Sequence, residues 1–404
     1  MKRTALAAAV ATLVATAVLL GGALRSEPAP AALDQRAQAH ELVTLGLELE
    51  AQARVSFDSS LYARAEEAFA EASGLDPSDP VAVRGLATVA LNRHEFRRAL
   101  GLARRAHSLA PELAATHGTM GDALVELGRY QEAFAAFDRY AALKPGFGAY
   151  VRVAYAQELL GRPGDAEATM QLALAAVPTG REPLAWTLTQ LGKLRFGTGD
   201  VAGAAREYRR ALRVLPRYVP AREGLALTEA ARGRPRRAIA TLAPVAETIP
   251  LPQAAATLGE LYRVVGDASA AARQDGLLRV EERLLASRGV RNDLETAALD
   301  VDRGVRLRES LAVLRRVHAE RPSIDADDAL GWALTRNGRC GEGLRYATRS
   351  LRLGTRDAAK LFHRGMAERC LGDMRGARRT FRLALATNPY FSLRWSPVAR
   401  RYAR

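Results

Sequence analysis

The sequence predicts an all-α fold, a solenoid of about ten stacked antiparallel helix pairs. The main observation is a spacing: an alanine is followed twelve residues later by a proline, and this pair recurs about every 34 residues. Pro77, Pro111 and Pro145 follow one another at intervals of 34 residues, and each lies twelve residues after its alanine. A period in this range is typical of helical hairpins that bury their apolar faces only by stacking on their neighbours.

The unit that ends at Pro111 shows both helices. Apolar residues recur at helical spacing from Val83 to Ala90 and again from Phe96 to Ala106, with a polar break between the two stripes. Pro111 ends the second helix because a proline cannot continue it. Helices of about a dozen residues are marginal in isolation, so packing between units must stabilise them.

Ten units follow from this alignment, starting near residues 46, 80, 114, 147, 185, 219, 252, 291, 324 and 358. Position 8 is small in all of them, which lets the partner helix approach closely: Ala53, Ala87, Gly121, Ala154, Gly192, Ala226, Gly259, Ala298, Gly331 and Gly365. Position 15 is glycine in seven units, where a turn needs a positive φ. Position 24 is often a large apolar residue.

With these positions, residues 46–390 resemble the tetratricopeptide repeat family. Its pattern of a small residue at 8, Ala at 20, an aromatic at 24, a small residue at 27 and Pro at 32 is met best by units two to six and ten. The resemblance implies a right-handed superhelix over residues 35–390. Units seven to nine depart from it, with Asp275 at the aromatic position and Ser310 and Gly343 at the alanine position. Extra residues near 179–183 and 286–290 are interpreted as longer connections.

The first residues have the pattern of a targeting segment. Lys2 and Arg3 precede an uncharged apolar run that ends at Leu24, as in a secretory signal. Residues 1–24 are therefore predicted to be a signal peptide or an uncleaved signal anchor, with membrane contact through residues 4–24 if uncleaved. A Pro/Ala linker is expected over 25–34. Both alternatives place the repeats outside the cytoplasm, secreted, periplasmic or anchored.

The positive charge is concentrated in the last third of the chain. The net charge is +15, and residues 301–404 carry 23 Lys+Arg against 10 Asp+Glu, a net of +13. Residues 391–404 are predicted to form a basic aromatic tail with Arg394, Arg400, Arg401 and Arg404. A basic region attracts an anionic envelope polymer or lipid, although it is equally compatible with a solvated face that has no partner. An exported chain seldom meets nucleic acid, so no nucleic-acid partner is expected.

No catalytic, metal or cofactor motif is present in the sequence, and the six histidines are scattered. We therefore expect no enzyme activity, no cofactor and no metal site. Cys340 and Cys370 fall near the turns of adjacent units, where their Cα atoms could come within disulfide reach in an exported protein. The alternative is a pair of thiols buried as small apolar side chains.

The resemblance also implies a concave groove lined by the first helix of each unit, which holds a partner peptide or helix. The candidate groove residues are Tyr155, Trp186, Lys193, Phe196, Trp332, Arg336, Phe362 and Arg369. Aromatic residues and arginine dominate binding energy at interfaces, although packing against the neighbouring unit is the alternative for each. The family's carboxylate clamp is not reproduced, since Arg84, Thr88, Gly118 and Asp122 occupy its positions. Docking of a chaperone's C-terminus is therefore not expected.

Three functional hypotheses follow. The leading one is a non-enzymatic scaffold, exported or membrane-anchored, that binds a protein partner in the groove. The second is a binder of an anionic polymer or membrane surface through the Arg-rich C-terminal third. The third is an auxiliary module of an enzyme or transport complex encoded elsewhere.

Overall fold

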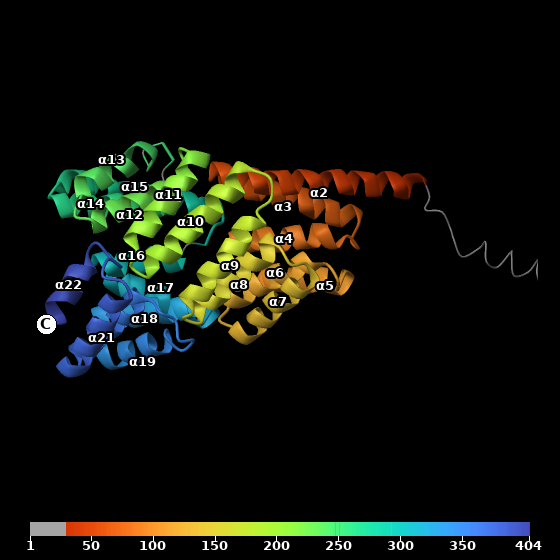
Figure 1. Ribbon diagram of the computed structural model, residues 1–404. Coiled ribbons are helices and arrows are strands. Elements are labelled where there is room, and N and C mark those ends of the chain that lie inside the picture. Colours follow the sequence, from red (N-terminus) through yellow and green to blue (C-terminus); the bar gives the residue numbers. More distant parts are fainter. Residues whose placement is uncertain (1–29, 247, 250, 292) are drawn as a thin grey trace, which may run out of the picture.

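The computed structural model describes residues 30–246, 248–249, 251–291 and 293–404, and every regular element in these ranges is an α-helix. The helices are α2 (Pro30–Ser56), α3 (Ser60–Leu75), α4 (Pro80–Asn92), α5 (Phe96–Leu109), α6 (Ala114–Glu126), α7 (Tyr130–Leu143), α8 (Phe147–Leu159), α9 (Pro163–Ala175), α10 (Arg181–Gly197), α11 (Val201–Val214), α12 (Val219–Ala231), α13 (Pro235–Ala246), α14 (Pro252–Val265), α15 (Ala268–Ser287), α16 (Asp293–Arg303), α17 (Leu307–Glu320), α18 (Ile324–Arg336), α19 (Cys340–Arg349), α20 (Ala358–Cys370), α21 (Met374–Thr387) and α22 (Trp395–Tyr402). Consecutive helices from α2 to α21 form ten pairs, and α22 follows the last pair (Figure 1). The predicted solenoid of helix pairs is confirmed.

Local signals set where each helix begins and ends. The Asp79 carboxylate caps α4 by accepting hydrogen bonds from the N–H groups of Val81 (2.7 Å) and Ala82 (3.3 Å). Pro80 occupies the first helical position, where a missing N–H costs nothing. In the turn after α6, Gly128 has a φ of 73°, which favours glycine.

A large ring on the second helix of a pair packs between two first helices. The Tyr208 ring of α11 lies against Gly192 of its own pair and against Gly224 of the next pair, and a Cβ on either glycine would meet it. Phe69 packs in the same way, and a Cβ at Gly85 would lie 2.5 Å from that ring. The small residue at position 8 is thus explained by the large residue at position 24. The second glycine, contributed by the next unit, was not anticipated from the sequence.

The superhelix closes on itself, because one full turn brings the chain back against its own first part. Tyr130 accepts the Ile324 N–H through its hydroxyl at 2.7 Å, and the Asn388 amide donates to the Phe196 carbonyl at 2.9 Å. These contacts join residues 194 and 192 positions apart, which is between five and six repeats. Figure 1 shows the later, teal and blue helices next to the earlier, yellow helices.

We call this contact the seam. On one side of it lie 93–97, 126–130, 159–161 and 196–199, and on the other side lie 289–291, 320–324, 354–355 and 388–389. Turn glycines allow the close approach: a Cβ at Gly128 would lie 2.5 Å from the Pro322 carbonyl oxygen, and a Cβ at Gly161 would overlap the carbonyl of Gly354. Of the glycines at position 15, Gly128, Gly161 and Gly199 therefore serve the seam as well as their own turns.

The irregular units remain in register by local substitutions. Asp275, at the aromatic position of unit seven, pairs with Arg263 (2.5 Å) and Arg303, so ion pairs replace the ring. In unit nine a Cβ on Gly343 would lie 3.0 Å from the Gly331 carbonyl oxygen, so two glycines let α18 and α19 touch. Ser310 of unit eight is buried like the alanine it replaces.

Two boundaries differ from the sequence interpretation. The extra residues near 179–183 and 286–290 lengthen helices rather than connections, since α10 has 17 residues and α15 has 20, against 13 or 14 in regular units. The helix α2 begins at Pro30, inside the segment 25–34 expected to be a linker. The predicted signal segment 1–24 lies outside the described residues. Among the helices described, none combines the length and apolar character needed to cross a membrane.

Candidate binding surface inside the superhelix

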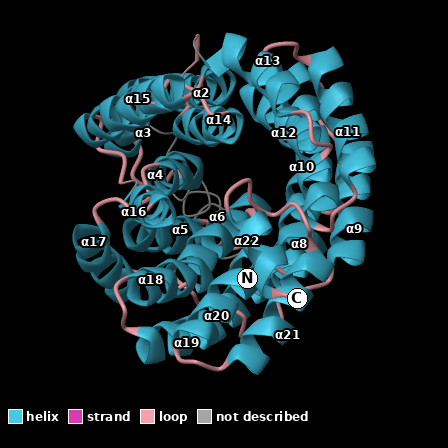
Figure 2. Cartoon of the chain, turned by 90° about the vertical axis from the view of Figure 1, so that its left-hand side faces the viewer, coloured by secondary structure: helices cyan, strands magenta, loops and turns pink. Residues whose placement is uncertain are grey.

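The candidate site is the inner surface, the axis-facing side of the first helices from α4 to α20. Figure 2 shows this arrangement most clearly for α8, α10, α12 and α14, which lie inside α9, α11, α13 and α15. Polar pairs with donor–acceptor distances of 2.6–3.0 Å tie successive first helices together: Asp122–Arg152, Glu223–Thr257, Asp302–Trp332, Asp325–Lys360 and Asp328–His363. Since these pairs fix the wall, the side chains that project from it are held in place.

A group of carboxylates lies on the inner surface next to the seam. We call Glu126 of α6, Glu158 of α8, Asp325 of α18 and Asp357, the N-cap of α20, the carboxylate cluster. Water reaches these groups, and the Asp325 side chain is 54% exposed. Protein nevertheless surrounds them on most sides, which is the environment of a side chain inside a concave wall.

The charge of this cluster is not fully neutralised. Burial raises the pKa of Glu126 to about 7, against the attraction of Arg321 and with repulsion from Asp325. Burial also raises the pKa of Glu158, with repulsion from Asp357 and Asp325. These raised pKa values mean that the nearby cations do not offset the cost of holding the carboxylates here, so an added cation would be stabilised.

Tyr155 of α8 lies near both glutamates and is 37% exposed. Burial raises the pKa of its hydroxyl, and Asp325 and Glu126 raise it further, so the side chain is a neutral phenol at any physiological pH. Its ring offers an apolar and cation-attracting face. Lys360 is one of the cations already beside the cluster: burial lowers its pKa, but Asp357 and Asp325 hold it well above the usual value. Its ammonium lies 2.7 Å from Asp325.

Comparisons with known proteins agree with the repeat fold. A family model described as tetratricopeptide repeat matches residues 119–181 and 189–248. These two ranges are therefore tetratricopeptide repeats. No curated protein gives a significant match.

Several solved structures match this chain at low sequence identity. The human IFIT1 dimer with m7Gppp-AAAA has a TM-score of 0.50 at 17% identity, covering 73% of this chain and 68% of that chain. A thermophilic repeat protein from Thermus thermophilus has a TM-score of 0.42 at 22% identity, covering 48% of this chain and 99% of that one. PilW, a type IV pilus biogenesis factor, has a TM-score of 0.43 at 18% identity, covering 50% and 92%.

The residues predicted to line the repeat groove divide into two groups. Tyr155 and Lys193 are exposed on the inner surface beside the carboxylate cluster. Trp186 is half-buried, with its ring edge-to-face with Phe147 at 6.3 Å between centroids. Phe196 is half-buried at the seam, where its carbonyl accepts the Asn388 amide. Only Tyr155 and Lys193 are therefore placed to meet a guest at the cluster.

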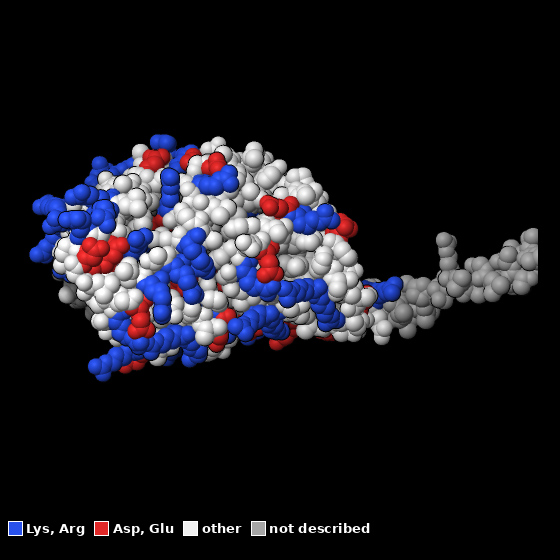
Figure 3. Space-filling model, turned by 90° about the horizontal axis from the view of Figure 1, so that it is seen from below, with Lys and Arg blue, Asp and Glu red and all other residues white. Residues whose placement is uncertain are grey.

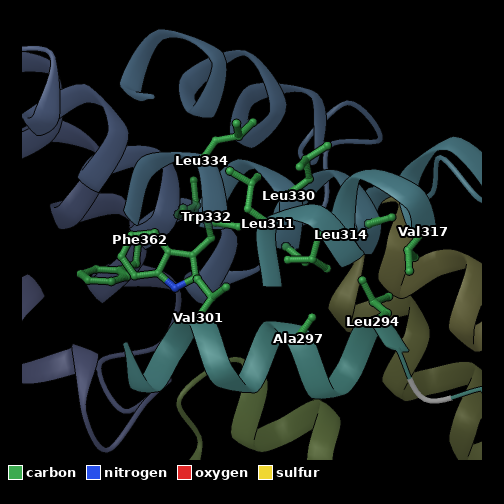
Figure 4. Packing of buried hydrophobic residues seen from close by; sticks show 14 of the residues in the cluster. Leu294, Ala297, Val301, Leu311, Leu314, Val317, Leu330, Trp332, Leu334 and Phe362 are labelled. Carbon is green, nitrogen blue, oxygen red and sulfur yellow. The ribbon is translucent and has the colours of Figure 1, made fainter. Parts of the chain in front are cut away.

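The prediction of open groove positions is wrong for Trp332 and Phe362, which are 2% and 0% exposed. Figure 4 shows both side chains within the apolar cluster, close to Val301 of α16. The remaining side of this pair is covered by Trp395 of α22, whose ring lies 5.5 Å from each of the other two rings. Arg336, predicted beside them, lies over the rings of both tryptophans.

Residues 391–404 are not a free tail. The segment folds back over α18 and α20 and ends in α22, and Arg394 forms an ion pair with Glu260 of α14 at 2.8 Å. Arg400 donates to the Pro389 carbonyl, whereas Arg401 and Arg404 are exposed. Arg369, also predicted to face a partner, lies 4.2 Å over the ring of Tyr402.

The two cysteines lie within disulfide reach, one of the two alternatives that their sequence positions left open. Cys340 and Cys370 have Cα atoms 5.8 Å apart, within the range of a disulfide, and their sulfur atoms meet. They link the start of α19 to the end of α20. Within the described residues, no group of three or more His, Cys, Asp or Glu side chains could hold a metal ion.

A cavity of about 260 Å³ on the seam is a weaker candidate. Residues of both charges line it, including Arg97, Arg291, Glu320 and Arg321. These side chains are already used by the seam, since Arg291 pairs with Glu320 at 2.7 Å and Arg97 donates to the Glu320 carbonyl. Little polar capacity remains for a ligand.

The carboxylate cluster was missed at the sequence level. Glu126, Glu158 and Asp325 occupy positions 13, 12 and 2 of their units, which are groove positions, but only aromatic and basic residues were selected there. Their proximity depends on the seam, which joins residues nearly two hundred positions apart. A search for acidic residues at groove positions would have found three of the four.

Proposed function

We propose that this chain is a non-enzymatic scaffold that binds a protein segment carrying lysine or arginine on its inner surface. Tetratricopeptide repeat proteins are generally protein–protein interaction scaffolds. The observation that carries the proposal is the carboxylate cluster around the exposed ring of Tyr155, with Glu126 and Glu158 held at raised pKa values. Burial is the main cause of these raised pKa values, and the attraction of a guest cation would offset part of its cost.

The shape and chemistry of the wall favour an extended segment with basic side chains. Side chains of such a segment alternate between its two faces, so one face can direct cations at Glu126 and Glu158 while aliphatic stems lie on Tyr155. The same carboxylates repel phosphate groups. Although IFIT1 was solved with m7Gppp-AAAA, the acidic wall does not support a nucleic-acid ligand at this site.

The test is the affinity of a defined peptide for the full chain. A fluorescein-labelled Lys–Thr repeat peptide is titrated at constant salt against the wild type and against the double variant Glu126→Gln/Glu158→Gln. We expect the Kd to rise at least tenfold in the double variant, since two charge-assisted contacts are weakened. A Glu–Thr peptide of the same length should not bind.

The matched control is Glu132→Gln, which removes a carboxylate on the outer helix α7 that pairs with Arg129. It should leave the Kd unchanged. Absence of measurable binding to the wild type, or an equal loss in the control, would contradict the proposal.

We also propose that the repeats act outside the cytoplasm, on the basis of the apolar run after Lys2 and Arg3. An oxidising compartment would allow the Cys340–Cys370 bond. The measurement is thiol labelling of the protein isolated from its native compartment, with and without reductant. Labelling only after reduction is expected, and two free thiols without reductant would contradict this proposal.

A second candidate function is attachment to an anionic membrane surface through α21. Its exposed face carries Arg375, Arg378, Arg379 and Arg382 next to Leu383, which is 55% exposed. Basic residues beside exposed apolar side chains are typical of helices that lie on a lipid surface. Figure 3 shows basic side chains gathered at the end of the molecule that carries the C-terminus.

Vesicle co-sedimentation separates this candidate from the first. The full chain should bind vesicles containing phosphatidylglycerol but not pure phosphatidylcholine, and Arg378→Glu/Arg382→Glu should abolish binding. The matched control Arg206→Glu/Arg213→Glu reverses two arginines on α11. Equal loss in both variants would indicate an unspecific charge effect and would contradict the α21 surface.

A further inference from the structure

We propose that residues 391–402 occupy, within the same chain, a second peptide-binding site whose ligand from a partner protein is a segment with an arginine directly followed by an aromatic residue. We call the surface beneath this segment the tail site. It is built from α14, α16, α18 and α20. This inference does not depend on the proposed function, because it uses a different set of side chains.

The aromatic half of the tail site is formed by Trp332 and Phe362 on the inner side of α18 and α20. The Trp395 ring lies edge-to-face against Trp332 and stacks on Phe362, with 5.5 Å between centroids in both cases. Phe391 adds a second ring 5.5 Å from Phe362. An aromatic residue fills a pocket here, which is the arrangement of an interface anchor.

The polar half recognises the arginine and the indole N–H. Arg394 donates to both carboxylate oxygens of Glu260, at 2.8 and 3.0 Å, in the fork geometry that selects arginine over lysine. Asp302 accepts from the indole N–H of Trp395 at 3.0 Å and from that of Trp332 at 2.8 Å. Because one carboxylate serves both indoles, it orients the guest ring against the pocket ring.

The segment crosses the inner surface as a separate peptide would. Leu393 packs on the apolar cluster of α12 to α14, whereas Trp395, two residues later, packs on α18 and α20. One short stretch therefore joins units that are far apart along the chain. Its partners belong to the inner-surface positions that the resemblance assigned to ligands, such as Trp332 and Phe362.

The segment is suited to exchange. Its anchors Phe391, Arg394 and Trp395 are half-buried, so no other helix covers them fully and the segment can leave without unfolding one. The helix α22 has eight residues, which is too short to be stable away from its site. Departure would expose Trp332 and Phe362, so a competitor with the same chemistry is needed to replace it.

The experiment uses the full chain and a labelled peptide with the sequence of residues 390–404. In the double variant Arg394→Ala/Trp395→Ala the tail loses its two anchors. We expect this variant to bind the peptide at least tenfold more tightly than the wild type, whose own tail competes. A peptide with alanine at both anchor positions should bind neither protein.

The matched control is Arg401→Ala/Arg404→Ala, which alters two exposed arginines of the same segment. It should bind the peptide as weakly as the wild type does. A folded anchor variant that does not bind the peptide, or a control that binds equally well, would overturn the proposal.

Hydrogen exchange of the wild-type chain decides the matter if the anchor variant fails to fold. We expect the amides of 395–402 to exchange at least a hundredfold faster than those of α21, and faster still when the peptide is added. Equal protection of α21 and α22, unchanged by the peptide, would make the segment a fixed cap and overturn the proposal.

Discussion

At the residue scale, burial raises the pKa of several carboxyl groups, and its consequence depends on whether water can reach the group. Glu50 is 4% exposed, and one of its carboxylate oxygens has no hydrogen-bond partner. Burial raises the pKa of Glu50 to about 7, because desolvation outweighs the attraction of Arg84 and Arg54. The same effect acts on Glu126 and Glu158, but there water and a guest can reach the group.

Glu50→Gln should stabilise the protein in a pH-dependent way. A carboxyl group whose pKa rises on folding favours the folded state only while it is protonated, so its contribution falls as the pH rises from about 4.5 to 7. We expect the substitution to raise the free energy of unfolding by about 2–3 kcal/mol at pH 8 and to change it little at pH 5. Urea denaturation at both pH values measures this. The same gain at pH 5 as at pH 8 would contradict the burial of the charge.

At the element scale, a ring set between two first helices fixes the distance between neighbouring pairs. Gly224 leaves the room that Tyr208 needs, and the ring is fully buried. Interiors of this density do not absorb an added methyl group without a shift of the backbone.

Gly224→Ala should therefore destabilise the solenoid by about 1–3 kcal/mol despite the higher helix propensity of alanine. Gly101→Ala is the matched control, since a Cβ there meets nothing within 4 Å. It should stabilise by about 0.5–1 kcal/mol. Thermal unfolding of both variants tests this prediction. If Gly224→Ala were stabilising, the Tyr208 ring would not be tightly packed against Gly224.

The sequence pattern predicts the helices, but it does not predict where residues 391–404 lie. The spacing of Pro77, Pro111 and Pro145 predicts the helix pairs, because the two helices of a pair lie within one 34-residue repeat of the sequence. The burial of Trp332 could not be read from its groove position, because the chain's own Trp395 covers it. Residue type alone does not say whether an aromatic side chain will meet a partner or its own chain.

At the scale of the whole molecule, the seam turns an open spiral into a closed one. Arg321 is 7% exposed and holds three groups from different elements: Glu126 at 3.2 Å, Glu295 at 3.7 Å and the ring of Phe96. Open repeat arrays respond to local loss of contact only at neighbouring units. Closure of the seam adds contacts between distant units. It also assembles the carboxylate cluster, because it brings Glu126 and Glu158 close to Asp325 and Asp357.

Arg321→Ala should open the seam without melting the repeats. We expect small-angle scattering to give a larger radius of gyration and hydrogen exchange to rise at 93–97 and 126–130, while helix content by circular dichroism stays the same. Arg316→Ala in the same unit, whose partner Asp293 is exposed, is the control. An unchanged radius of gyration in Arg321→Ala would show that the seam does not depend on this side chain.

The most direct measurement of the central claim is the pH dependence of Lys–Thr peptide binding to the wild-type chain. Since the pKa of Glu126 is about 7, the carboxylate cluster gains charge between pH 6 and pH 8. We expect a Kd at least threefold lower at pH 8 than at pH 6, and no such change in Glu126→Gln/Glu158→Gln. Equal affinity at both pH values, or tighter binding at pH 6, would contradict it.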